Sequence, residues 1–165
     1  MVMMTILLFV LIALGSVIVD QVTKILAVKF LMPIDTAPII KDVIHLTYSE
    51  NTGAAFGMLK NSRWVFMIFS VVAIIAIIVY FFIEKPRNKW CVISLALILG
   101  GGIGNMIDRV IYGYVVDFID FRLINFAIFN GADSCITVGA VILVIYFVMS
   151  EIKAVKNKKN EDNGN

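Results

Sequence analysis

Four apolar stretches, each long enough to cross a membrane, alternate with polar segments along the chain. A membrane-spanning helix needs about 20 mostly apolar residues, because an α-helix rises about 1.5 Å per residue. The four stretches cover roughly Val2–Val19, Trp64–Ile83, Trp90–Ile107 and Phe129–Ser150. This pattern predicts an all-α polytopic membrane protein with four transmembrane helices.

Two of the polar segments have the pattern of β-strands. The segment DVIHLTYS, residues 42–49, alternates apolar and polar residues from Ile44 to Tyr48, which is the period of a strand. The segment VIYGYVVDFIDF, residues 110–121, is rich in β-branched and aromatic residues around Gly113, which also favours a strand. We therefore expect a small sheet that lies on the membrane surface and shields a site.

The positions of lysine and arginine predict the orientation of the spans. The link between the second and third spans contains Lys85, Arg87 and Lys89, and the tail after residue 150 contains four lysines. Because short loops rich in these residues stay in the cytoplasm, both termini are predicted to be cytoplasmic. The basic residues of the first outer loop oppose this orientation, but the rule weakens as loops become longer.

The same pattern divides the chain into one membrane domain and a tail. The domain covers residues 1–150, with two outer loops at about 20–63 and 108–128. Residues 151–165 are polar and uniform, so we expect a basic, disordered tail on the cytoplasmic side.

The composition agrees with a membrane protein and limits the kinds of partner and metal site that we expect. Of the 165 residues, 61% are hydrophobic and 16% are charged, and the mean hydropathy is +0.96, which excludes an ordinary soluble domain. The net charge of +2 is too small to indicate a nucleic-acid partner. One histidine and two cysteines, with no CxxC pair, provide too few ligands for a zinc site. We therefore expect neither a metal nor another cofactor.

Polar residues gather where the spans are predicted to reach the outer face. Asp20 and Lys24 lie four positions apart on one helical face at the end of the first span, where a local ion pair is the simplest interpretation. Asn105, Asp108 and Arg109 share one side of the third span. Asp108 and Arg109 could neutralise each other, or the arginine and Asn105 could bind a carbonyl or carboxylate of a ligand.

Four further polar residues lie near the same boundary. Asp117 stands between two apolar residues, and Asn130 and Asp133 are one helical turn apart at the start of the fourth span. A carboxylate in that position costs free energy, so we expect it to have a function. Asn51 opens the segment NTGAAFG, which predicts either a turn or a backbone loop that approaches a ligand.

The third and fourth spans are consecutive and joined on the outer side, so Asp117 and Asp133 can meet at the membrane boundary. Two carboxylates in a low-dielectric site share one proton. The charged one can activate a water molecule, and the protonated one can polarise a carbonyl. This chemistry favours an aspartic peptidase, but a small proton- or ion-coupled transporter could use the same carboxylates.

Five segments taken together resemble a known family. DQVTK, NTGAAFG, GNMIDR, VVDFID and FNGADS occur in the order and spacing of the bacterial lipoprotein signal peptidases, also called signal peptidase II. The resemblance covers the chain from Asp20 through the fourth span. It implies a four-helix membrane bundle with a small β-cradle on the outer face, in the bacterial cytoplasmic membrane.

The resemblance also implies an activity and a set of partners. Members are aspartic endopeptidases that remove signal peptides from lipid-modified prolipoproteins, on the amino side of the diacylglyceryl-cysteine. The expected partners are these prolipoproteins, membrane lipids and inhibitors of the globomycin type. Carried over by motif, the catalytic residues are Asp117 and Asp133. Substrate binding or support of the dyad falls to Asn51, Asn105, Arg109 and Asn130, and structural support to Asp20, Lys24 and Asp108.

Overall fold

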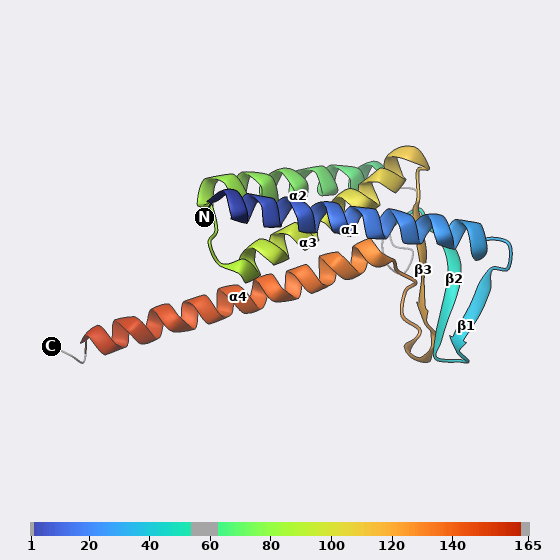
Figure 1. The fold of residues 1–165 in the computed structure, drawn as a ribbon. Helices are drawn as coiled ribbons and strands as arrows, with labels where there is room; N and C mark the ends of the chain where they lie inside the picture. Colours follow the sequence, from blue (N-terminus) through green and yellow to red (C-terminus); the bar gives the residue numbers. More distant parts are fainter. Residues whose placement is uncertain (1, 54–62, 163–165) are drawn as a thin grey trace.

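The computed structural model describes residues 2–53 and 63–162. Four long helices lie alongside one another, and a three-stranded sheet stands at one end of them (Figure 1). All four helices are long and apolar enough to cross a membrane, which confirms the predicted architecture. In chain order the elements are α1 (Val2–Phe30), β1 (Thr36–Ile40), β2 (Ile44–Asn51), α2 (Arg63–Glu84), α3 (Lys89–Ile111), β3 (Val115–Phe121), η2 (Arg122–Ile124) and α4 (Gly131–Asp162).

Helices α1 and α3 both extend further than the sequence pattern predicts. The outer loops were expected to begin near residues 20 and 108, but α1 continues to Phe30 and α3 to Ile111. Ala27 and Leu31, at the end of α1, pack with Val116 of the sheet, so the added turns are stabilised by contact with β3. Asp20 and Lys24 therefore lie within α1, as their predicted position on one helical face requires.

Helix α4 extends past the predicted boundary at residue 150. It remains helical to Asp162, so residues 151–162 are not disordered as the sequence analysis predicts. The segment is rich in lysine, with alanine and glutamate, and has no glycine or proline before Gly164. These residues have good helix propensity, and they prolong a helix that is already formed.

The three strands form an antiparallel sheet in the order β1-β2-β3. Strand β3 falls within the second predicted segment, although residues 110–111 belong to α3, and β2 begins in the first predicted segment and continues two residues past it. β1 was not predicted, because Pro38 interrupts its pattern; proline is accepted in this position because β1 is an edge strand. Ser49 of β2 is paired with Asp117 of β3, which places one member of the predicted dyad in the sheet.

Glycines let α1 and α4 approach α3 closely. A Cβ atom on Gly100 would lie 2.7 Å from the carbonyl oxygen of Ala13, and one on Gly101 would overlap the carbonyl oxygen of Ala132. A Cβ atom on Gly104 would lie 2.5 Å from a carboxylate oxygen of Asp20. Such close packing at small residues is typical of membrane helices, and here it brings α1, α3 and the start of α4 together at the end next to the sheet.

Candidate active site

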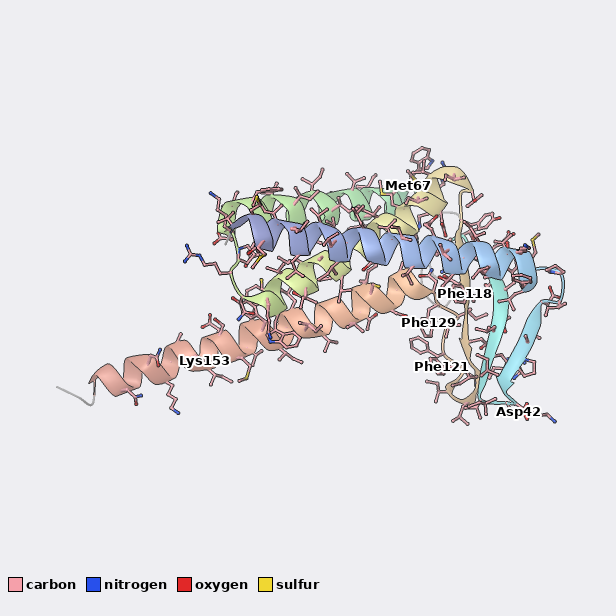
Figure 2. All side chains as sticks on the ribbon, in the orientation of Figure 1. Asp42, Met67, Phe118, Phe121, Phe129 and Lys153 are labelled. Carbon is pink, nitrogen blue, oxygen red and sulfur yellow. The ribbon has the colours of Figure 1, made fainter. Side chains whose placement is uncertain are left out.

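A short bridge between β3 and the segment before α4 assembles the site. The backbone oxygen of Phe129 accepts hydrogen bonds from the N–H groups of Phe118 (3.0 Å) and Ile119 (2.8 Å). The rings of Phe121 and Phe129 also stack, with centroids 5.6 Å apart, and Figure 2 shows these phenylalanines together beside the start of α4. Because Asn130 directly follows Phe129, this bridge holds the first turn of α4 against β3.

Asp117 is buried, with 2% of its surface exposed, and two asparagine amides bind its carboxylate. Asn51 Nδ2 donates to Oδ2 at 2.9 Å, and Asn130 Nδ2 donates to Oδ1 at 2.6 Å. The oxygen of the Asn51 amide accepts from the N–H of Gly53 at 3.0 Å. This last contact fixes the direction of the Asn51 amide, so that its NH₂ group faces Asp117.

Asp133 lies in the first turn of α4 and forms a reciprocal cap with Asn130. The N–H of Asp133 donates to Asn130 Oδ1 at 3.0 Å, and the N–H of Asn130 donates to Asp133 Oδ2 at 3.2 Å. This is a capping box, which satisfies two backbone donors at a helix start. The other oxygen of Asp133 accepts from Asn105 Nδ2 at 2.7 Å. Asp133 is therefore both a helix cap and an acceptor from α3.

Two asparagine side chains connect the two carboxylates. Asn130 Nδ2, which binds Asp117, also lies 3.1 Å from Asn105 Oδ1, and Asn105 Nδ2 binds Asp133. Lys24 Nζ donates to the same Asn105 oxygen at 2.9 Å. Because an ammonium group can only donate, this contact directs the oxygen of Asn105 toward Lys24 and its NH₂ group toward Asp133.

Lys24 is the centre of a second buried cluster directly behind the dyad. Its ammonium group lies 2.8 Å from Asp20 Oδ2 and 3.0 Å from Asp108 Oδ2, with side-chain exposures of 3% for the lysine and 1% for each aspartate. The predicted Asp20–Lys24 ion pair is present, and Asp108 pairs with Lys24. The sequence analysis missed Gln21, whose Nε2 donates to Asp108 Oδ1 at 3.0 Å; its position next to Asp20 was the available signal.

The same two aspartates hold the backbone immediately before the dyad residues. Asp20 Oδ1 accepts from the N–H of Ala132 at 2.8 Å, and Asp108 Oδ2 accepts from the N–H of Val116 at 3.1 Å. Ala132 precedes Asp133, and Val116 precedes Asp117. The Lys24 cluster therefore fixes the backbone next to each of the two dyad residues.

Arg109 lies apart from Asp108, although the two are neighbours in sequence. Its Nη1 atom is 3.4 Å from the backbone oxygen of Asn105, and its guanidinium lies 5.3 Å from the centre of the Phe66 ring. The charges of Asp133, Asp117 and Asp108 all act on this guanidinium, that of Asp133 most strongly. Asp108 thus forms its direct ion pair with Lys24 and not with Arg109, and Arg109 brings positive charge to the dyad.

The surroundings of Asp117 favour its protonated form. Burial, and after it the charge of Asp133, raise the pKa of this carboxyl from 3.8 to about 7. The hydrogen bonds from Asn51 and Asn130 favour the ionised form and oppose the shift. A carboxyl group with a pKa near 7 can give and take a proton at neutral pH, as general acid–base chemistry requires.

Eight of the nine residues singled out from the sequence thus lie in two linked clusters at one end of the bundle, and the ninth, Arg109, contacts the first of them through the backbone oxygen of Asn105. The carboxylates and their amides form the first, and Asp20, Lys24 and Asp108 form the second. Of the segment NTGAAFG, residues 54–57 lie outside the described residues. Within 2–53 and 63–162, no three histidine, cysteine, aspartate or glutamate side chains are grouped as ligands for a metal ion.

Known proteins share this sequence and fold. A family model described as signal peptidase (SPase) II matches residues 12–149. A lipoprotein signal peptidase from Caldanaerobacter subterraneus subsp. tengcongensis is 56% identical over 127 residues, which cover 77% of this chain and 86% of that protein. The lipoprotein signal peptidase from Halothermothrix orenii is 43% identical, over 82% of this chain and 91% of that protein.

Two solved structures, both described as bacterial membrane enzymes, resemble the fold. The one at 2.3 Å resolution has a TM-score of 0.78 and 34% identity, and the match covers 87% of this chain and 88% of that chain. The one at 1.9 Å resolution has a TM-score of 0.76 and 35% identity, over 84% of this chain and 91% of that chain. These neighbours and the four candidate spans identify a multi-pass membrane protein. With a family model that matches most of its length, the chain belongs to the signal peptidase II family of peptidases.

Proposed function

We propose that this protein removes signal peptides from lipid-modified prolipoproteins, as an aspartic endopeptidase whose catalytic pair is Asp117 and Asp133. The observation that carries the proposal is the buried bridge Asp117–Asn130–Asn105–Asp133, in which each carboxylate accepts a hydrogen bond of 2.6–2.7 Å from an amide. Such a pair, held at the end of a membrane bundle, can perform acid–base chemistry without a metal or a covalent intermediate.

In the proposed mechanism, Asp117 carries the shared proton and Asp133 is ionised. The raised pKa of Asp117 supports the first assignment. The second rests on the position of Asp133 in the first turn of α4, where the positive end of the helix dipole stabilises a carboxylate.

The proton transfers then follow from these assignments. Asp133 takes a proton from water as the water oxygen attacks the scissile carbonyl carbon, and Asp117 gives its proton to the carbonyl oxygen. When the tetrahedral intermediate collapses, the C–N bond breaks, Asp133 gives its proton to the leaving amine, and Asp117 regains a proton from the hydroxyl group.

We propose that the lipid of the substrate lies along α2 and α3. An apolar cavity of about 350 Å³ lies between α2 and α3, and Met106 and Val110, which flank Arg109 on the helix, are among its lining residues. A substrate that arrives sideways from the bilayer could lay an acyl chain along this surface. We propose that Arg109 then holds a carbonyl or ester oxygen near the dyad.

The direct test is cleavage by the purified protein. A diacylglyceryl-modified prolipoprotein and its unlipidated form would be incubated with the full chain in detergent micelles, and the products would be identified by mass spectrometry. We expect a fragment that begins with the diacylglyceryl-cysteine, and only from the lipidated form. The absence of this fragment, or equal cleavage of both forms, would refute the proposal.

The predicted location belongs to the same proposal. We propose a single membrane domain in the bacterial cytoplasmic membrane, with both termini cytoplasmic and the dyad near the outer face. Lipid-modified prolipoproteins, membrane lipids and globomycin-type inhibitors are the proposed partners. The basic link 85–89 between α2 and α3, remote from the dyad, supports this orientation.

Activity should depend on the proton of Asp117. We expect kcat/KM for the lipidated substrate to fall as the pH rises through about 7, because Asp117 then loses the proton that it gives to the carbonyl oxygen. The free energy of unfolding should also fall between about pH 4 and pH 7, because the folded chain holds this proton more tightly than the unfolded chain. The pH profile of initial cleavage rates measures the first effect, and a profile that is flat from about pH 6 to pH 9 would contradict it.

Replacement of Arg109 tests whether this residue binds substrate or supports the structure. If Arg109 binds substrate, Arg109→Ala should lower kcat/KM by about 10- to 100-fold, the loss expected for a hydrogen bond to a charged group. The melting temperature should change little, because Arg109 is not part of the Lys24 cluster. Parallel losses of cleavage and of thermal stability would instead favour a structural role.

A further inference from the structure

A groove opens along α4 at the end of the bundle opposite the dyad. Figure 1 shows α4 diverging from the other helices toward its C-terminal end, and Figure 2 shows Lys153 on this separated part. Between the start of α3 and the exposed half of α4 lies a cavity of about 560 Å³. Neither the dyad nor its supporting residues line it, so its role is separate from the proposed cleavage.

The groove has an apolar floor and a basic end. Ile142, Ile145 and Met149 form the apolar part on α4, and Lys153 follows Met149 by one turn. Trp90, on α3, forms the opposite wall, and Lys89 Nζ lies 5.3 Å from the centre of its ring. Aromatic residues beside lysines are typical of the level at which lipid headgroups begin.

Positive charge predominates around this end of the groove. Residues 84–89 and 150–157 contain five basic and two acidic side chains. The acidic ones are Glu84 and Glu151, and both are exposed. An anionic group placed near Lys89 and Lys153 would therefore meet a favourable electrostatic field.

The dimensions of the groove indicate the shape of its occupant. The lining on α4 runs from Ile142 to Lys153, about 16 Å along the helix axis. An extended hydrocarbon chain suits an apolar floor that is elongated in this way.

We propose that this groove binds an anionic phospholipid, with one acyl chain along Ile142, Ile145 and Met149 and its phosphate between Lys89 and Lys153. A soluble phosphate would use the lysines but not the apolar floor. A zwitterionic lipid would use the floor but gain less from the excess of positive charge. Both parts of the groove are therefore needed to select an anionic lipid.

The test compares lipids and variants of the purified full-length chain. Phosphatidylglycerol, phosphatidylcholine and soluble glycerol phosphate would each be titrated into the protein in a neutral detergent. Retained lipid would be measured by native mass spectrometry and stabilisation by the shift in melting temperature. We expect saturable binding of phosphatidylglycerol, weaker binding of phosphatidylcholine and no stabilisation by glycerol phosphate.

Two variants test the two parts of the groove, and a third is the control. Replacing both lysines, in the double variant Lys89→Gln/Lys153→Gln, should weaken phosphatidylglycerol binding by about 10- to 30-fold. Met149→Trp should weaken it by filling the floor while leaving the lysines in place. Lys29→Gln removes a lysine that lies 5.3 Å from the ring of Phe30 at the dyad end of the bundle, and should bind like the unchanged protein.

Three outcomes would overturn the proposal. They are equal affinity for the two lipids, unchanged binding by the double lysine variant, and an equal loss in the Lys29→Gln control. Melting temperatures without added lipid show whether each variant is folded, so loss of binding can be distinguished from loss of structure. Cleavage is not part of the measurement, so the result does not depend on the proposed function.

Discussion

Asp133→Asn is expected to abolish cleavage of a lipid-modified prolipoprotein while the variant still inserts into the membrane and accumulates. The substitution keeps the shape of the side chain but removes the base that takes a proton from water. We expect a loss of about 10²- to 10⁴-fold or more in kcat, the range for general acid–base groups. Initial rates on purified, lipidated substrate measure this loss, and the level of protein in isolated membranes measures accumulation.

Asp117→Asn should have an equally large effect for a different reason. Both oxygens of this carboxyl group accept hydrogen bonds, from Asn51 and from Asn130. An asparagine at 117 has only one acceptor oxygen and has no acidic proton to give to the carbonyl group. We therefore expect loss of cleavage together with a modest loss of stability, which a melting curve would report.

Asp120→Asn is the matched control for both substitutions. Asp120 is in the same strand as Asp117 and is also buried, at 8% exposure. Its carboxylate binds Thr47 and Arg122 and not the dyad amides. Cleavage by this variant should stay within a few-fold of the unchanged protein. If Asp120→Asn abolished cleavage, or if either dyad variant cleaved at a near-normal rate, the assignment of Asp117 and Asp133 as the pair would fail.

The sequence predicts the helices and two strands because each of these elements leaves a local pattern of apolar and polar residues. Long apolar stretches fix the four spans, and alternation from Ile44 to Tyr48 lies within β2. The length of α1 could not be predicted in this way. Its last turns are stabilised by packing of Ala27 and Leu31 against Val116, a contact between residues about 90 positions apart.

The candidate site was predictable as a set of residues but not as an arrangement. Carboxylates in apolar surroundings mark Asp117 and Asp133, because burying a charge is costly. The direction of each asparagine amide depends on partners that are distant in sequence, as when Lys24 orients Asn105 across 81 positions. Spacing alone therefore left open whether Asp108 would pair with Arg109, and only the fold shows that it pairs with Lys24.

Lys24→Met is expected to reduce both the stability and the activity of the protein. Methionine nearly preserves the length of the side chain but removes the ammonium group that lies between Asp20 and Asp108. The two buried carboxylates would then face each other without their cation, at a cost of about 3–5 kcal/mol. Chemical unfolding and the amount of protein in membranes measure this loss. Lys29→Met, an exposed substitution on the same helix, should change stability by at most about 0.5 kcal/mol.

Stability alone would not show whether Lys24 also orients the dyad, and a second substitution separates the two effects. In Lys24→Met/Asp108→Asn one of the two carboxylates is neutral, so part of the lost stability should return. The amide of Asn105 would still lack the donor that directs its NH₂ group toward Asp133, so cleavage should stay low. Recovery of cleavage together with stability would mean that Lys24 acts only by neutralising the buried carboxylates, and that the direction of the Asn105 amide is set by Asn130 and Asp133 alone.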